Sequence, residues 1–100
     1  MLINDYCRQA SPFNKRRFIE GRIPTNEIEY DVNGTKYTNL VCTLNTDQKI
    51  SLTISAHYDV VNYNYENCLD NSASVVNLIK LYNRLKSEKL RYNVSLAFID

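Results

Sequence analysis

The second half of the chain changes its hydrophobic period, and the change predicts a β-α-β unit. Apolar and polar residues alternate over residues 50–56, which predicts a strand with Leu52, Ile54 and Ala56 on one face. From Asn71 the period becomes 3.6, which predicts a long helix. Its apolar stripe comprises Val75, Leu78, Ile79, Tyr82 and Leu85. Residues 93–99 are predicted to form a final strand. Short connections between strand, helix and strand predict that the two strands are parallel and lie in one sheet.

A β-hairpin is predicted before this unit. Residues 28–32 alternate apolar and polar, Asn33-Gly34 is a typical type I′ turn, and residues 35–44 return as the partner strand. The core positions expected on the second strand are Tyr37, Leu40, Val41 and Leu44. The predicted fold class is therefore α/β, a mixed β-sheet with a β-hairpin edge and a β-α-β unit.

Two short helices are predicted at the amino-terminal end, over residues 2–10 and 12–20, and Gly21 ends the second. Residues 60–69 are polar and rich in Tyr and Asn, which favours a loop. Asp70 or Ser72 is expected to cap the long helix. One long and two short helices are too few to cover four strands on both faces. We therefore expect the remaining part of the domain, or another chain, to cover the sheet, and an exposed edge near residues 93–99.

Composition and charge exclude several classes of protein. Twelve Lys and Arg against 11 Asp and Glu give a net charge of +1, so nothing in the overall charge favours nucleic acid. The basic triplet Lys15-Arg16-Arg17 is interpreted as a solvated helix face. No apolar run approaches the roughly 20 residues of a membrane helix. Because Met1-Leu2-Ile3-Asn4-Asp5 is unlike a signal peptide and the three cysteines are widely spaced, we expect a cytoplasmic protein without membrane contacts.

Candidate chemistry gathers where the strand of residues 50–56 ends. His57, the one histidine of the chain, follows this strand, and open α/β sheets bind ligands beyond the carboxyl ends of their strands. Asp59 points the same way as His57 if the strand continues, and its carboxylate can then accept a hydrogen bond from the imidazole N–H and so fix the tautomer. Asp70 at the helix start can share a metal with His57, and this donor set suits zinc or a similar divalent ion. Each residue also has a structural interpretation: a hydrogen-bonded histidine, and an aspartate that caps the helix.

Three segments together carry a family resemblance. Ser55-Ala56-His57-Tyr58-Asp59-Val60, Asp70-Asn71-Ser72-Ala73-Ser74-Val75 and the strand that ends at Asp100 resemble, in order and spacing, the M28-type zinc aminopeptidases. The resemblance covers about residues 37–100. It implies part of a three-layer sandwich of the phosphorylase/hydrolase-like, zinc exopeptidase type. It also implies two zinc ions in the complete domain, with His57 as a terminal ligand, Asp70 as the bridging carboxylate and Asp59 as the residue that orients His57.

The resemblance also implies that the chain is incomplete. In the family a Glu-Glu pair follows the strand that here ends at Asp100, and a further Asp and a second His come later. We therefore expect residues 1–100 to be the N-terminal part of a single domain, from a metallo-aminopeptidase that hydrolyses N-terminal residues of peptides by a metal-activated water. The isolated chain is expected to be inactive. Two alternatives stay open: a non-catalytic remnant or interaction module, and part of a single-zinc enzyme related to the glutaminyl cyclases.

Overall fold

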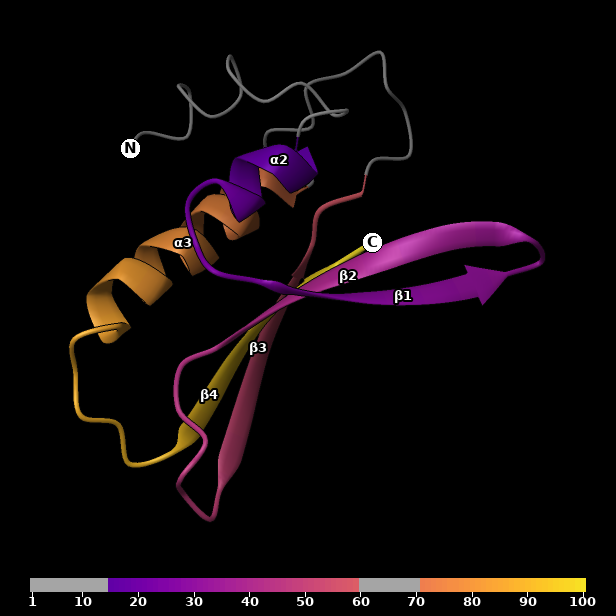
Figure 1. The fold of residues 1–100 in the computed structure, drawn as a ribbon. Coiled ribbons are helices and arrows are strands. Elements are labelled where there is room, and N and C mark those ends of the chain that lie inside the picture. The colour runs from indigo at the N-terminus through magenta and orange to yellow at the C-terminus, as the bar shows by residue number, and fades with distance from the viewer. Residues whose placement is uncertain (1–14, 60–70) are drawn as a thin grey trace.

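The computed structural model describes residues 15–59 and 71–100. Their elements follow the predicted order, and are α2 (Lys15–Glu20), β1 (Asn26–Val32), β2 (Thr35–Thr43), β3 (Ser51–His57), α3 (Ala73–Leu85) and β4 (Asn93–Ile99) (Figure 1). The predicted helix at residues 2–10, the beginning of the helix at 12–20 and the loop at 60–69 lie outside the described residues. None of the described helices is long and apolar enough to cross a membrane.

The four strands form one mixed sheet in the order β1-β2-β4-β3. β1 and β2 are antiparallel, β2 and β4 are antiparallel, and β3 and β4 are parallel, which confirms the predicted β-α-β unit and hairpin. The prediction of an exposed edge at residues 93–99 is wrong. The chain returns from α3 between β2 and β3, so β4 is hydrogen-bonded on both sides and the free edges are β1 and β3.

The turn between β1 and β2 has the predicted conformation. Asn33 and Gly34 both have positive φ, 53° and 84°, as a type I′ turn requires. The Gly34 amide donates a 2.8 Å hydrogen bond to the Asp31 carboxylate. β2 pairs with β4 only through residues 40–43, so residues 35–39 pair with β1 alone. The hairpin therefore extends as an arm beyond the end of β4 (Figure 1).

The core lies between the sheet and the two helices. On β2 the buried residues are Thr38, Leu40 and Cys42, and Leu40 and Cys42 are paired with Phe98 and Leu96 of β4. The core positions expected at Tyr37 and Val41 are therefore wrong, because alternation places both on the opposite face, where they are half-buried. Leu40 is buried as predicted, and Leu44 is partly buried against the core.

α3 packs on the sheet with the predicted stripe. Val75, Leu78 and Ile79 are buried, and the adjacent Val76 is buried as well. Tyr82 and Leu85 pack against the core from the second half of the helix. Ser72 does not cap the helix, because its backbone is already helical (φ −59°, ψ −34°) and its side chain makes no capping hydrogen bond. Asp70, the other predicted cap, lies outside the described residues.

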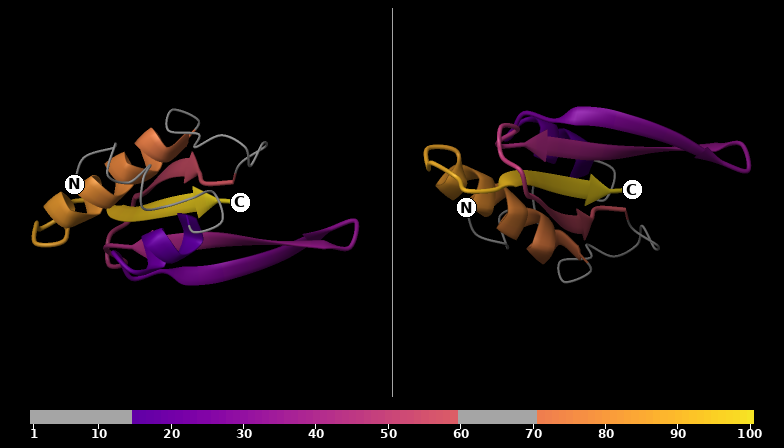
Figure 2. Two further views of the ribbon diagram at one scale, coloured as in Figure 1. Left: turned by 90° about the horizontal axis from the view of Figure 1, so that it is seen from above. Right: turned by 90° about the horizontal axis from the view of Figure 1, so that it is seen from below.

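α2 packs over the same face as α3 (Figures 1 and 2). The solvated basic face predicted for this helix is wrong for Lys15, whose side chain is fully buried. Arg16 instead lies near the surface and forms ion pairs with Glu20 at 2.7 Å and with Glu27 of β1 at 2.5 Å. The Gly21 amide donates to the Arg17 carbonyl at 3.0 Å, so the helix ends as predicted.

Large parts of the sheet are left uncovered by the described helices. On the face away from the helices, Ile28, Tyr30 and Val32 of β1 are exposed. On the helix side, Leu52 and Ile54 of the edge strand β3 are still 48% and 40% exposed. That the remaining part of the domain, or another chain, covers these residues stays a prediction.

Candidate functional site

His57 is the last residue of β3, and its side chain contacts Asp59. The imidazole Nδ1 lies 3.2 Å from the Asp59 Oδ1, with about half of each side chain exposed. Ala56 and Tyr58 are buried in the core. Because side chains alternate along extended backbone, His57 and Asp59 share the opposite side. The contact expected from the His-x-Asp spacing is thus present in the structure.

Tyr58, between these two residues, is anchored by three interactions. Its amide donates a 2.9 Å hydrogen bond to the Ile99 carbonyl, its ring belongs to the core, and its hydroxyl donates to the Thr38 carbonyl of β2. Burial raises the pKa of the Tyr58 hydroxyl, with a smaller contribution from the negative charge of Asp100. This anchor was not predicted from the sequence, in which the available signal was an aromatic residue between the His and the Asp of an alternating strand.

Asp100 ties the end of β4 to the arm of the hairpin. Its Oδ2 accepts a 2.9 Å hydrogen bond from the Thr38 amide, and its own amide donates to the Asn39 Oδ1 at 2.9 Å. Its carbonyl accepts a 2.8 Å hydrogen bond from the Tyr30 hydroxyl. Desolvation raises the pKa of Tyr30, and the negative charges of Asp100 and Asp59 raise it further. This β1 residue therefore interacts electrostatically with the candidate site.

These contacts were not predicted from the sequence because they join residues far apart in the chain. Tyr30 comes from β1, Thr38 from β2, Tyr58 follows β3 and Asp100 follows β4. They meet where the parallel strands β3 and β4 end, which is the edge at which open α/β sheets place ligands. The candidate site therefore consists of the His57–Asp59 pair and of a hydrogen-bonded framework, which is formed by Tyr30, Thr38, Tyr58 and Asp100.

The donor atoms at this site fit one part of a zinc site. Metal-binding histidines commonly donate their second ring N–H to a carboxylate, which fixes the tautomer and the ring orientation. The Asp59 contact to Nδ1 fits this arrangement, in which Nε2 would be the nitrogen that faces a metal. No group of three or more His, Cys, Asp or Glu side chains with metal-binding geometry occurs in residues 15–59 and 71–100. Asp70 lies outside these ranges, so the roles of His57 and Asp70 as zinc ligands stay predictions.

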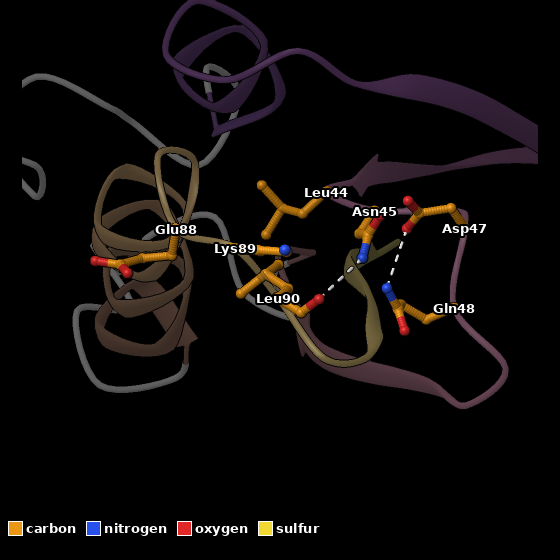
Figure 3. Close-up of a pocket in the computed structure, with 7 residues that line it drawn as sticks. All are labelled: Leu44, Asn45, Asp47, Gln48, Glu88, Lys89 and Leu90. Carbon is orange, nitrogen blue, oxygen red and sulfur yellow. Dashed lines mark hydrogen bonds between the residues drawn. The ribbon is translucent and has the colours of Figure 1, made fainter.

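A pocket of about 170 Å³ lies at the opposite end of the sheet (Figure 3). It is lined by Leu44, Asn45, Asp47, Gln48, Glu88, Lys89 and Leu90. These residues follow β2 or precede β4, so they lie beside the amino ends of the parallel strands. The Asn45 side chain donates to the Leu90 carbonyl across the pocket at 3.4 Å. The pocket therefore joins two loops and is separate from the His57–Asp59 pair.

Comparison with known proteins gives a likeness of fold. No family model matches the sequence, and no curated protein matches it. Among solved structures, the glutaminyl cyclase of Fimbriiglobus ruber superposes with a TM-score of 0.69 at 15% sequence identity, over 98% of this chain and 42% of the cyclase chain. The chain thus shares part of the α/β fold of a glutaminyl cyclase. It spans less than half of that neighbour's length.

Proposed function

We propose that residues 1–100 form the first part of a zinc-dependent catalytic domain that acts on the amino-terminal end of peptides. The observation that carries the proposal is the 3.2 Å contact between His57 and Asp59 at the carboxyl end of a parallel strand. The TM-score of 0.69 to a glutaminyl cyclase supports it at the level of the fold. In this function His57 binds zinc through Nε2, Asp59 holds the imidazole, and Asp70 supplies a carboxylate ligand.

Zinc supplies a Lewis acid that polarises a carbonyl group and activates a bound water at such a site. The chain's own contribution is to orient the imidazole before the metal arrives. Asp59 would do so by accepting a hydrogen bond from Nδ1–H, which keeps the proton on Nδ1 and directs the Nε2 lone pair to the metal. Further ligands and a general base are expected from residues beyond Asp100, in a Glu-Glu pair followed by an aspartate and a histidine.

Two activities fit this proposal. A metallo-aminopeptidase would use two zinc ions bridged by Asp70 to hydrolyse N-terminal residues. A glutaminyl cyclase would use a single zinc ion, and the fold shared with a solved glutaminyl cyclase is compatible with this second candidate. The zinc content of the protein and its product from a peptide with N-terminal glutamine separate them. Two zinc ions and a free amino acid indicate the peptidase, whereas one zinc ion and a cyclised peptide indicate the cyclase.

The coding sequence beyond the codon for Asp100 provides the first test. The proposal expects a Gly-Glu-Glu-like stretch in frame, followed by an aspartate and a histidine. A stop codon at that position would favour an interaction module in place of an enzyme.

The second test measures zinc in the full protein by elemental analysis. His57→Ala and Asp70→Asn are expected to lower the zinc content, whereas Asp47→Asn, a carboxylate change at the opposite end of the sheet, leaves it unchanged. If His57→Ala retains the zinc content and the activity of the wild type, the proposal is wrong.

A further inference from the structure

Tyr58, which lies between His57 and Asp59, connects three strands. Tyr58 follows β3, its amide donates to the Ile99 carbonyl of β4 at 2.9 Å, and its hydroxyl donates to the Thr38 carbonyl of β2. Because the sheet order places β4 between β2 and β3, the Tyr58 side chain reaches across the end of β4. The tyrosine is 7% exposed, so its ring is held by the core while its hydroxyl is held by the backbone of β2.

The acceptor of this hydrogen bond is itself fixed. The Thr38 amide donates to the Asp100 Oδ2 at 2.9 Å, and the Asp100 amide donates to the Asn39 Oδ1 at 2.9 Å. The register of β2 and β4 pairs Leu40 with Phe98, and its extension by two residues brings Thr38 opposite Asp100. The Asp100 carboxylate thus connects β2 and β4 two residues beyond their last paired residues. The Thr38 carbonyl is therefore held at a defined position.

We propose that Tyr58 is a positioning residue, whose hydroxyl bond to the Thr38 carbonyl keeps the His57 and Asp59 side chains together for metal binding. This inference rests on the proposed function. Extended backbone through residue 59 is needed for the two side chains to share one side, yet β3 ends at His57. The three anchors of Tyr58 supply this geometry beyond the end of the strand. Loss of the hydroxyl bond frees Asp59 to leave the imidazole.

If Tyr58 has this role, the position of the His57 and Asp59 side chains depends on its hydroxyl and not only on its buried ring. Tyr58→Phe removes the hydroxyl and keeps the ring. Tyr82→Phe is the matched control, because Tyr82 lies in the second half of α3, packs against the core there, and has a ring contact with Lys86 that needs no hydroxyl. Residues 1–100 contain one histidine, and the proposed function expects another beyond Asp100. The imidazole signals that disappear from the nuclear magnetic resonance spectrum of His57→Ala therefore identify those of His57.

The experiment titrates zinc into the full protein and follows the His57 ring signals. Tyr58→Phe is expected to weaken zinc binding by about tenfold, the lower end of the effect of residues that support a metal ligand. In the zinc-free protein the same variant is expected to lower the fraction of the tautomer with the proton on Nδ1. Tyr82→Phe is expected to change neither quantity. Wild-type zinc affinity and tautomer fraction in folded Tyr58→Phe would overturn the inference and leave Tyr58 as a core residue.

A second pair of variants covers the case in which Tyr58→Phe does not fold. Asp100→Ala removes the acceptor that fixes Thr38, whereas Asp100→Asn keeps an acceptor oxygen. We expect Asp100→Ala to shift the His57 tautomer signals in the same direction as Tyr58→Phe and Asp100→Asn to restore most of the shift. Equal signals in both Asp100 variants and the wild type would contradict the inference. Failure of the proposed function has a different signature, because His57→Ala would then bind zinc as the wild type does while the tautomer readout still tests Tyr58.

Discussion

The Tyr30 hydroxyl donates a 2.8 Å hydrogen bond to the backbone carbonyl of Asp100, 70 residues further along the chain. Tyr30 lies on the edge strand β1, and its ring stacks on Tyr37 of β2 with centroids 5.2 Å apart. The bond therefore ties the hairpin arm to the end of β4, at the edge of the sheet that carries His57. The arm thus contributes to the framework of the candidate site, although no residue of β1 was expected there from the sequence.

Replacement of Asp59 should weaken zinc binding while the fold is retained. Asp59→Ala removes the carboxylate 3.2 Å from the imidazole Nδ1 and is expected to lower zinc affinity by about 10–100-fold. Asp59→Asn keeps an acceptor oxygen, so its loss should be smaller. Isothermal titration calorimetry measures both affinities, with Asp47→Ala as the control at the opposite end of the sheet. Wild-type affinity in Asp59→Ala would show that Asp59 has no role in orienting His57.

Truncation of Leu96 should destabilise the fold strongly. Leu96 is fully buried at the centre of β4, where a Leu→Ala change leaves a cavity and costs about 2–5 kcal/mol of unfolding free energy. The control is Ile28→Ala, because the Ile28 side chain is 52% exposed and its loss should cost roughly 0.5 kcal/mol or less. Urea unfolding followed by circular dichroism gives both values. Similar losses in the two variants would contradict the assignment of the core to the helix side of the sheet.

Gly34→Ala should destabilise the hairpin through backbone conformation alone. Gly34 has φ +84°, and a Cβ at this position would meet no atom within 4 Å. The cost of the positive φ to alanine is about 1 kcal/mol. Gly34→Asn should cost less, because asparagine tolerates this conformation. Thermal unfolding of the three proteins tests the order Gly, Asn, Ala, and a stability of Gly34→Ala equal to the wild type would contradict it.

The buried thiol of Cys42 should make stability depend on pH above neutrality. Burial raises the pKa of Cys42 above its ordinary value of 9.0. The contribution of the buried thiol to the free energy of unfolding is fully present below the ordinary pKa. It is lost as the pH rises through the raised pKa of the folded state, because the thiol loses its proton first in the unfolded chain. Urea unfolding at about pH 8 and about pH 10 measures this loss, with Cys7 and Cys68 replaced by serine. Cys42→Ala in the same background should lose less stability over this range, and an equal loss would contradict the prediction.

The uncovered parts of the sheet should cause self-association of the isolated chain. Ile28 and Val32 are exposed on β1, and Leu52 and Ile54 are exposed on the edge strand β3. Exposed apolar residues on unpaired edge strands favour association with other chains. Leu52→Lys with Ile28→Lys should therefore shift the protein toward the monomer in sedimentation velocity. Glu29→Lys on the same strand as Ile28 is the control, and a wild-type chain that is monomeric at high concentration would contradict the prediction.

The local pattern of the sequence predicted the elements well and their environment less well. The Asn33-Gly34 turn, the strand that ends at His57 and the stripe of α3 all follow from short-range periodicity. The face of β2 that enters the core does not follow from this periodicity, because both faces carry hydrophobic residues: Tyr37 and Val41 on one, Leu40 and Cys42 on the other. The pairing of Leu40 with Phe98 makes this choice, and it joins residues distant in the sequence.

The same reason explains which parts of the candidate site were predictable. The contact between His57 and Asp59 is local, so the spacing of the two residues was sufficient to predict it. The roles of Tyr58 and Asp100 depend on the position of β4 inside the sheet. That position was not evident from a β-α-β pattern, which predicts that β3 and β4 are parallel and leaves their order relative to β2 open. The burial of Lys15 likewise depends on how α2 packs on the core, whereas the charge of the residue alone predicted exposure to solvent.

The position of β4 between β2 and β3 has a consequence for the order of folding. The ribosome makes the hairpin and β3 before β4, yet β2 and β3 are not neighbours in the sheet. Of the four strands, only β1 and β2 can reach their final pairing before β4 emerges. Pairing of β3 with β4 must also wait for the α3 crossover, and such non-local contacts form slowly. Until β4 has been synthesised, β3 therefore exposes both of its edges together with Leu52 and Ile54. We expect the nascent chain to depend most on a chaperone during this period.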